Sequence, residues 1–573
     1  MGKLPDRKQC CRIWRKCATA LMAAAFLPVP TLAANIPSAV EPSHITPLIE
    51  GPREPELSAP GESLPVFPKS VELPPPPTTE NVRFILSAVK IEGATLYTPE
   101  QLRPYYAKSL GKIVPVAEAQ AIANRITSRY RNDGYILSQA VVPRQDLGYG
   151  ILHIRVVEGF VDRIIVEGDG KDADKRGMVE EYGAKIAHDR PLKIATLERY
   201  LLLMNELPGL SARAVLQPSA DNFGAASLVV TLSRKRVDAS LATGNRVTPY
   251  LGSLQQTATL AVNSLAGLDE RTQMQASVAT PERAMHLFGV QHEEQLDSEG
   301  TKLSVSASQT QTRPGLTLAP LQLEAVSKDV QFLVQHPFIL LRRESLTGRI
   351  AFDYRNTDTT VFGNTVLSDD RVRALRVGGN YTFADRWRGA SLIDAEASHG
   401  LNVMGASAPG DLRSNLNAPA DFSKLNVDVS RTQPLQGNYS LFTALSAQLS
   451  ADPLLAAEQF SVGGPAFGSA YDPGALAGDQ GAAARAELRY DSELSGRVPL
   501  TYQAYGFYDL GAVWDRTKTP PKNSLASAGL GLRFGLTPHL SGTTELAVPL
   551  TKKAGLISEG HTPRVFFTLQ ATY

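Results

Sequence analysis

The residue types that most often carry chemistry form no recognisable catalytic pattern in this 573-residue chain. A Gly-x-x-x-x-Gly-Lys phosphate loop, a Gly-x-Ser-x-Gly elbow and a His-Glu-x-x-His pair are all absent from the sequence. His286, His292 and His336 are scattered over separate segments, so their spacing predicts neither a metal site nor a catalytic group. We therefore expect no enzymatic activity, no catalytic residue, no metal and no cofactor.

The end of the chain is patterned instead as a strand with two unlike faces. One face is apolar and consists of Val565, Phe567, Leu569, Ala571 and Tyr573. Most of the alternate positions are polar, namely Arg564, Thr568, Gln570 and Thr572. A strand of this kind can place one face against lipid and the other in a wet lumen. The pattern is typical of a bacterial outer-membrane β-barrel.

Residues 1–34 have the pattern of a secretory signal peptide. Six basic residues precede the apolar run of residues 18–27, and small residues offer a cleavage site after Ala33 or Ala34. All three cysteines lie in this segment, at positions 10, 11 and 17, so we expect no disulfide in the mature protein. The segment carries six basic residues and one acidic residue, so its removal changes the net charge from +1 to about −4. Strong nucleic-acid binding is therefore not expected.

Residues 35–80 are predicted to form a semi-rigid, extended periplasmic linker. Prolines recur so often between Pro37 and Pro77 that two uninterrupted helical turns do not fit between them. The segment can be a simple spacer or a proline-rich docking site.

Residues 81–159 and 160–236 are predicted to form two tandem α+β modules with the order β-α-α-β-β. Thr98-Pro99-Glu100-Gln101 forms a capping box in the first module. The other expected elements of that module are strands over 84–91, 136–142 and 151–157 and a helix ending near 132–134. The second module is expected to have strands over 161–167, 212–217 and 227–232 and helices over 174–187 and 193–204. Each short sheet either leaves an edge open for an extended peptide or has its edges covered.

Residues 237–573 alternate between apolar and polar positions. Leu346, Ile350, Phe352 and Tyr354 share one face, and Thr347, Arg349, Asp353 and Arg355 share the other. Charged residues on one face of a strand require a polar side, which a lumen provides. Sixteen such segments begin near residues 238, 254, 271, 284, 301, 328, 346, 372, 391, 421, 439, 481, 501, 525, 541 and 564. We expect a mainly β protein with a 16-stranded transmembrane barrel whose lumen holds a pore, a plug or both.

The chain resembles the two-partner secretion transporters of the hemolysin secretion and activation type. In the first module the resemblance rests on residues 130–145, Tyr-Arg-Asn-Asp-Gly-Tyr-Ile-Leu-Ser-Gln-Ala-Val-Val-Pro-Arg-Gln, and on Val-Val-Glu-Gly at 156–159. In the second it rests on residues 197–209, Leu-Glu-Arg-Tyr-Leu-Leu-Leu-Met-Asn-Glu-Leu-Pro-Gly, and on Ala-Val-Leu-Gln-Pro at 214–218. In the barrel, Phe-Tyr-Asp-Leu-Gly at 507–511 is similar to a strand motif of the family.

The resemblance implies two periplasmic POTRA domains and a barrel in the outer membrane. They would capture one large exoprotein unfolded and export it. It also implies a long inward-folded loop near residues 460–481, with Ser469, Ala470, Tyr471, Gly478 and Asp479 as candidate pore-loop residues. The family also often has an N-terminal plug helix. The proline spacing of residues 35–77 argues against that helix, which would leave the loop to close the pore alone.

The loop tip departs from the family pattern. The family has Val-Arg-Gly-Tyr or Val-Arg-Gly-Phe where this chain has Gly468-Ser469-Ala470-Tyr471, so the arginine that would pair with Asp509 is missing. A carboxylate in the lumen then requires hydration or another cation, and Arg485 and Arg489 are the candidates.

The expected partners are the exoprotein, outer-membrane lipid and the barrel assembly machinery, which would insert a monomeric chain. Phe567, Leu569 and Tyr573 are the candidate assembly signal in the last strand. An assembly factor of the related insertase class, which uses the same module types, is the alternative function. An outer-membrane lipase is a third possibility, but no sequence motif supports it.

Overall fold

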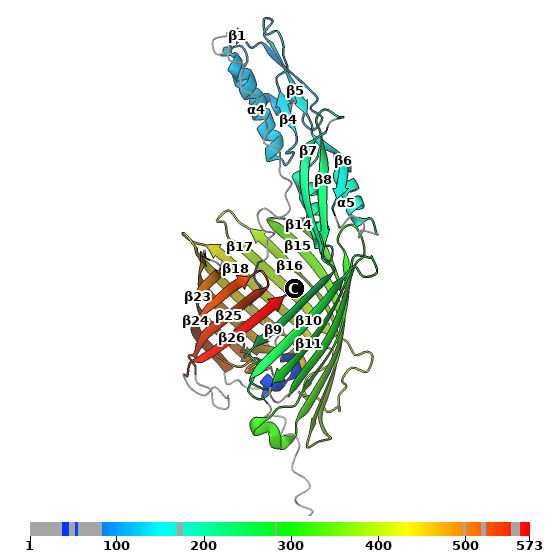
Figure 1. Cartoon of the computed structure of the whole chain (residues 1–573), viewed down its shortest axis with the longest axis vertical. Helices are drawn as coiled ribbons and strands as arrows, with labels where there is room; N and C mark the ends of the chain where they lie inside the picture. The colour runs from blue at the N-terminus through cyan, green and yellow to red at the C-terminus, as the bar shows by residue number, and fades with distance from the viewer. Residues whose placement is uncertain are drawn as a thin grey trace, which may run out of the picture.

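The computed structural model describes residues 37–44, 52–55, 83–168, 176–219, 221–280, 284–494, 496, 500–516, 523–551 and 562–573. The expected signal peptide, with Cys10, Cys11 and Cys17, lies outside these described residues, as does most of the proline-rich segment. Two small α+β modules follow one another at one end of a large β-barrel (Figure 1). Among the helices that the structure describes, none has the length and apolar character needed to cross a membrane.

The barrel is a single closed antiparallel sheet of sixteen strands, which confirms the predicted fold class. Its strands are β9 Val237–Gly244, β10 Leu254–Asn263, β11 Glu270–Thr280, β12 Met285–Gln295, β13 Lys302–Thr312, β14 Glu324–Leu341, β15 Glu344–Val361, β16 Thr365–Ala384, β17 Ala390–Gly400, β18 Ser423–Pro434, β19 Tyr439–Ser450, β22 Gln480–Leu494, β23 Leu500–Trp514, β24 Asn523–Thr537, β25 Leu540–Pro549 and β26 Arg564–Thr572. Most strands begin within a few residues of the predicted positions. β16 begins at Thr365 rather than near residue 372, because its first residues pair with β15 in an extension that alternation alone did not reveal.

The two faces of the barrel wall differ as the alternation predicted. Ile350 and Val377 point outward and are 55% and 52% exposed. On the inner face Arg349 lies 2.7 Å from Asp394, and Arg376 pairs with Asp353. An apolar outside and a charged inside are what a lipid bilayer and a water-filled lumen require of a barrel.

The barrel closes between its first and last strands. Thr568–Thr572 of β26 pair with residues 240–244 of β9, and the amide of Tyr573 donates to the carbonyl of Ala239 at 2.8 Å. Lys235 Nζ donates to the main-chain oxygen of Tyr573 at 2.6 Å and lies over its ring. The terminal aromatic is therefore fixed beside the junction between the second module and β9.

The first module consists of a three-stranded sheet packed on one long helix. Its elements are β1 Arg83–Ile85, β2 Ala88–Glu92, α3 Pro99–Leu102, η3 Arg103–Tyr105, η4 Ala107–Ser109, β3 Ile113–Pro115, α4 Val116–Asn132, β4 Gln139–Val141 and β5 Ile151–Val157. Thr98 and Gln101 form the expected capping box. The single strand expected over 84–91 was wrong: it divides into β1, which pairs with β3, and β2, which pairs with β5. The backbone amides of Leu86 and Ser87 bond to other segments at the break.

The second module repeats this plan. Its elements are β6 Phe160–Glu167, α5 Met178–His188, α6 Ile194–Glu206, β7 Leu210–Pro218 and β8 Ala225–Arg234, with the strand order β6-β8-β7. Tyr182, Ile186, Leu197 and Leu203 form part of the core between the helices and the sheet. The element order matches the sequence prediction.

Glu158, which follows β5, links the segment before α3 to helix α4 in the first module. Its carboxylate accepts hydrogen bonds from the amides of Thr95 and Leu96 and from the hydroxyls of Thr95 and Tyr130. Burial opposes ionisation, but the hydrogen bonds from Thr95 and Tyr130 outweigh it and hold the pKa of Glu158 below its ordinary value.

Glu158→Gln should destabilise the first module by about 1–3 kcal/mol, because the amide cannot accept this set of bonds. Because the folded pKa is depressed, the stabilisation is present above the unfolded pKa and is lost as the pH falls through the folded value. Hydrogen exchange of α4 and β5 amides in the full chain, measured at pH 7 and at pH 4, would test both statements. Equal protection in the variant and the native chain at pH 7 would contradict them.

The second module is attached to the barrel through the turn between β12 and β13. Glu299 in this turn pairs with Lys185, with Arg199 at 3.3 Å and with the hydroxyl of Tyr200 at 3.2 Å. Gln295, at the end of β12, also donates to the hydroxyl of Tyr182. Side chains of α5 and α6 thus fix the module against the rim.

Glu299→Ala should loosen this attachment. Glu299 is 43% exposed, so solvent screens its ion pairs and the expected loss is about 1 kcal/mol. The distribution of distances between a spin label on α5 and one on the end of β12 farthest from this turn should be broader than in the native chain. Substitution of the half-buried Glu198 on α6 is the control, and equal broadening in both variants would contradict this role.

Candidate functional site

The lumen contains a long loop between β19 and β22. It includes η7 Ala456–Glu458 and the short antiparallel pair β20 Phe460–Val462 and β21 Leu476–Gly478. Val462 and Tyr471 of the loop form an apolar cluster with Phe507 and Phe566 of the barrel wall, and all four are at most 5% exposed. The loop therefore folds inward with a core of its own, at the position where the sequence predicted it.

The tip of this loop is held by the barrel wall. The amide of Ser469 donates to Asp509 at 3.1 Å, and the carbonyl of Ser469 accepts from Arg246 at 3.1 Å. Asp509 also accepts from the hydroxyl of Ser527, which in turn accepts from the amide of Ala470 at 3.3 Å. Ser469 and Asp509 are both fully buried, so these contacts are shielded from solvent.

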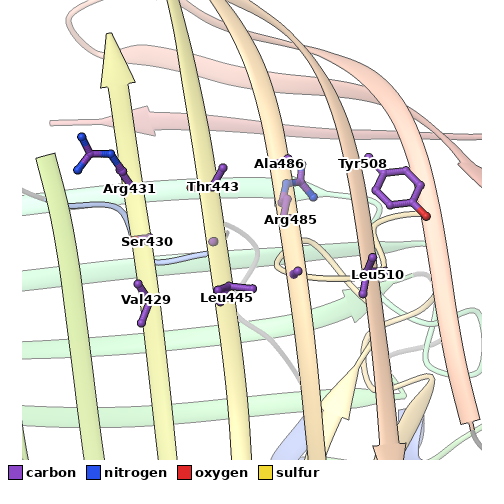
Figure 2. Close-up of a pocket in the computed structure, with 11 residues that line it drawn as sticks. Val429, Ser430, Arg431, Thr443, Leu445, Arg485, Ala486, Tyr508 and Leu510 are labelled. Atoms are coloured by element: carbon purple, nitrogen blue, oxygen red, sulfur yellow. The ribbon is translucent and has the colours of Figure 1, made fainter. Parts of the chain in front are cut away.

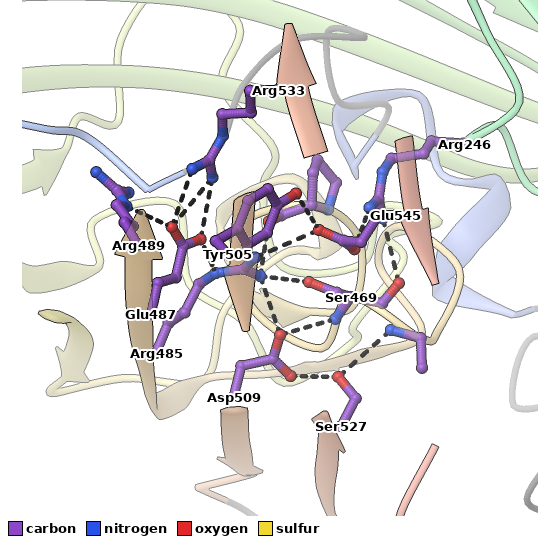
Figure 3. Close-up of polar contacts among 12 residues, drawn as sticks. Arg246, Ser469, Arg485, Glu487, Arg489, Tyr505, Asp509, Ser527, Arg533 and Glu545 are labelled. Atoms are coloured by element: carbon purple, nitrogen blue, oxygen red, sulfur yellow. Dashed lines mark hydrogen bonds and ion pairs between the residues drawn. The ribbon is translucent and has the colours of Figure 1, made fainter. Parts of the chain in front are cut away.

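Arg485 of β22 supplies the cation that the loop tip lacks. Its guanidinium lies 3.1 Å from Asp509 and donates to the hydroxyl of Ser469 (Figure 3). It also pairs with Glu487 at 2.7 Å and with Glu545 at 3.4 Å. The sequence analysis considered Arg485 and Arg489 equally, and the structure places only Arg485 against Asp509.

Arg489 has different partners. Its Nε pairs with Glu487 at 2.7 Å, and its terminal nitrogens donate to both oxygens of Glu54 at 2.8 and 2.7 Å. Glu487 is fully buried and also pairs with Arg533 at 3.1 Å. Sequence analysis missed Glu487 and Arg533, although their charge at lumen-facing strand positions was a usable signal, and it missed Arg246, which lies in the loop between β9 and β10.

The other loop residues singled out from the sequence are also anchored. The hydroxyl of Tyr471 donates to the carbonyl of Thr551 at 2.6 Å. Asp479 accepts from the amides of Leu454 and Arg516 at 2.9 and 2.8 Å. A Cβ at Gly478 would lie 3.1 Å from the backbone nitrogen and oxygen of Trp514, so any other residue would crowd the wall there.

A second anchor holds the other end of the loop. Glu458 of η7 is 1% exposed and lies 2.8 Å from Arg376 and 2.8 Å from Lys424. Arg355 approaches the same carboxylate at 3.9 Å. These cations come from β16, β18 and β15, on another part of the wall from Asp509. No sequence motif marked Glu458, because it lies in an aperiodic segment.

Part of the segment predicted to be a periplasmic linker lies inside the barrel. The turns η1 Ser38–Val40 and η2 Pro42–His44 appear in blue within the barrel, toward the end away from the modules (Figure 1). Ser38 Oγ donates to the carbonyl of Gly474 at 2.6 Å, and Val40 is 2% exposed. Arg53 lies 3.1 Å from Asp394 of β17.

The linker prediction is therefore wrong for residues 37–44 and 52–55. These residues form only 3-10 turns and extended backbone, as the prolines require. The expectation that the loop fills the lumen without help is also wrong, because these residues lie beside it.

A groove of about 370 Å³ lies on the outer wall across β18, β19, β22 and β23 (Figure 2). Leu445, Tyr508 and Leu510 line it and are 57%, 48% and 43% exposed on the outward face. Small side chains at Ala484 and Ala486 keep it open. Its exposed lining belongs to the outward face of the wall, so the groove lies outside the lumen.

The candidate assembly signal is on the outward face of the seam. Leu569 and Tyr573 are 40% and 74% exposed, and Phe567 is half-buried. Their neighbour Phe566 points inward instead and stacks on Arg246. Assembly remains a prediction for these three residues.

Comparison with known proteins agrees with this architecture. Residues 224–534 match the family described as haemolysin secretion/activation protein ShlB/FhaC/HecB, and residues 84–159 match the ShlB-type POTRA domain. The heme/hemopexin transporter protein HuxB of Haemophilus influenzae is 20% identical over 82% of this chain and 84% of its own length. The outer membrane transporter CdiB of Escherichia coli is 23% identical over 82% and 80%.

A solved structure of CdiB from Escherichia coli superposes with a TM-score of 0.70 at 21% identity, covering 89% of this chain and 94% of that one. That likeness concerns the fold. The family match covers more than half of the present sequence. The chain belongs to the haemolysin secretion/activation family of outer-membrane transporters, with its POTRA modules in the periplasm.

Proposed function

We propose that this transporter captures one large exoprotein unfolded in the periplasm and exports it through the barrel lumen. The observation that carries the proposal is the content of the lumen. It is lined with charged groups and holds two parts of the chain that do not belong to the wall, the loop and residues 37–44 and 52–55. Both parts are held to the wall by non-covalent contacts, so they can be displaced. Their displacement would open a polar path for an extended chain.

The modules would supply the capture surface by strand addition. β7 is an edge of the sheet in the second module. Asn205 bonds to both the amide and the carbonyl of Ala212, which shows that these backbone groups point away from β8. The backbone amides and carbonyls of Ala214 and Leu216 also point away from β8, because the direction of the backbone groups repeats every two residues along a strand. They offer an extended peptide a ladder of donors and acceptors.

Other edges suit this role less well. In β4 of the first module the amide of Ala140 donates to the side chain of Thr127 on α4. β4 spans only Gln139–Val141, so this one contact uses much of its edge, whereas β7 continues to Pro218 beyond the contact that Asn205 makes with it. We assign capture to the outer edge of β7, and we expect the transporter to act as a monomer that the barrel assembly machinery inserts.

The test is a comparison of culture medium and outer membrane from the native host, with and without this gene. Loss of one large protein from the medium, with the outer membrane unchanged, is the expected result. Depletion of many other barrels from the outer membrane would overturn the proposal and indicate an assembly factor instead.

A further inference from the structure

Four arginines and four carboxylates form one connected set of ion pairs in the lumen. The arginines are Arg246, Arg485, Arg489 and Arg533, and the carboxylates are Glu487, Asp509, Glu545 and Glu54. Seven of these residues belong to the barrel strands or the adjoining β9–β10 loop. Glu54 alone comes from the N-terminal segment. The set is therefore electrically balanced only while that segment is in place.

Glu487 is the centre of this set. Its Oε1 accepts from Arg485 Nε and its Oε2 from Arg489 Nε, both at 2.7 Å. Arg485 also bonds to the loop tip at Ser469, and Arg489 also binds Glu54 through two hydrogen bonds. The loop tip is thus linked to the buried carboxylate of Glu487 through Arg485, and the N-terminal segment is linked to it through Arg489.

We infer that Glu487 and Arg489 are positioning residues that couple the N-terminal segment to the loop tip. When Glu54 leaves, the terminal nitrogens of Arg489 lose both acceptors in a space where a lone charge is costly. Glu487 is the nearest remaining carboxylate of Arg489. Turning toward it brings Arg489 into competition with Arg485 for Oε1, which weakens the contact that Arg485 makes with Ser469.

The coupling is reciprocal, since any link between two binding equilibria acts in both directions. A loop tip that moves away lets Arg485 turn toward Glu487 and compete with Arg489 for Oε2, which weakens the contact that Arg489 makes with Glu54. The two lumen segments would then be released in sequence rather than independently. The inference rests on the proposed function only in treating the loop as a gate, and the coupling itself can be measured without export.

The test is the reactivity of a cysteine placed in the loop tip, Ala466→Cys, in the purified chain without residues 1–34, which has no other cysteine. In Glu54→Gln the rate of reaction with a maleimide should rise about fivefold or more. Arg489→Gln should leave the rate near that of the native chain and should suppress the rise in Glu54→Gln, because without Arg489 no side chain freed from Glu54 competes with Arg485 for Glu487. A rise in the double variant equal to that in Glu54→Gln would overturn the inference. Heat-modifiable migration on gels shows that each variant retains its barrel.

Arg53→Gln is the matched control. Arg53 adjoins Glu54 and also fixes the segment to the wall, but its partner Asp394 is not connected to Glu487. Its loss should leave the reactivity of the introduced cysteine unchanged. No change in Glu54→Gln, or an equal rise in Arg53→Gln, would overturn the inference. The two proposals can fail separately. If the coupling is found in the purified chain but loss of the gene removes no protein from the medium of the native host, the inference is supported and the proposed function is contradicted.

Discussion

Replacing Arg485 with serine should release the loop tip from the barrel wall. The substitution leaves Asp509 buried without a cation, and breaking one side of a buried ion pair costs about 3–5 kcal/mol. It also removes the donor to Ser469. Single-channel recordings in planar bilayers should show openings that are more frequent than those of the native chain.

Moving the arginine to the loop should reverse this effect. In Arg485→Ser with Ser469→Arg, the cation returns to Asp509 from the loop side, where the family has it. Ser469→Arg by itself should disturb the tip, because it adds a second guanidinium to a fully buried position beside Arg485. Adding Ala470→Gly, which gives Arg-Gly-Tyr at positions 469–471, should not relieve that conflict.

Arg533→Gln is the control for the arginine exchange. Arg533 pairs with Glu487 and is 34% exposed, and its polar partners Glu487 and Gln503 are wall residues rather than loop residues. Its channel should open no more often than that of the native chain. If Arg485→Ser also opens no more often than the native chain, or if the double variant opens as often as the single one, then Arg485 does not anchor the loop.

The barrel could be predicted from the sequence because its physical cause is local. Side chains at alternate positions face lipid and water, so the sequence positions of Ile350 and Arg349 are enough to predict which face each one is on. The start of β16 was missed because strand length beyond the membrane depends on pairing with β15 rather than on alternation. The split between β1 and β2 likewise depends on hydrogen bonds to distant segments.

The lumen could be predicted only in part. Asp509 was identified through a motif, but Glu458 and Arg246 lie in aperiodic segments, and their partners are far away in sequence. Prolines indicate the backbone conformation of residues 37–44 and 52–55 and not their location. That location depends on Val40, which is buried, and on Glu54, which meets Arg489. Neither contact has a short-range sequence signature.

Ala214→Pro should reduce export at least about tenfold if β7 captures the exoprotein. Proline removes the amide hydrogen that points away from β8, and it leaves the β7–β8 ladder intact, because edge strands accept proline at such positions. The measurement is the amount of exoprotein in the medium, relative to the amount of transporter in the outer membrane. A lower amount of transporter would indicate misfolding and not failed capture.

Arg213→Ala is the matched control for capture by β7. Arg213 is adjacent and exposed, and its backbone groups point toward β8, so this substitution changes a side chain and leaves the outer edge unaltered. Recognition by strand addition depends mainly on backbone groups, so export should persist in this control. If Arg213→Ala abolishes export and Ala214→Pro does not, then the exoprotein is recognised through side chains on the open face of the sheet. In that case the edge assignment is wrong.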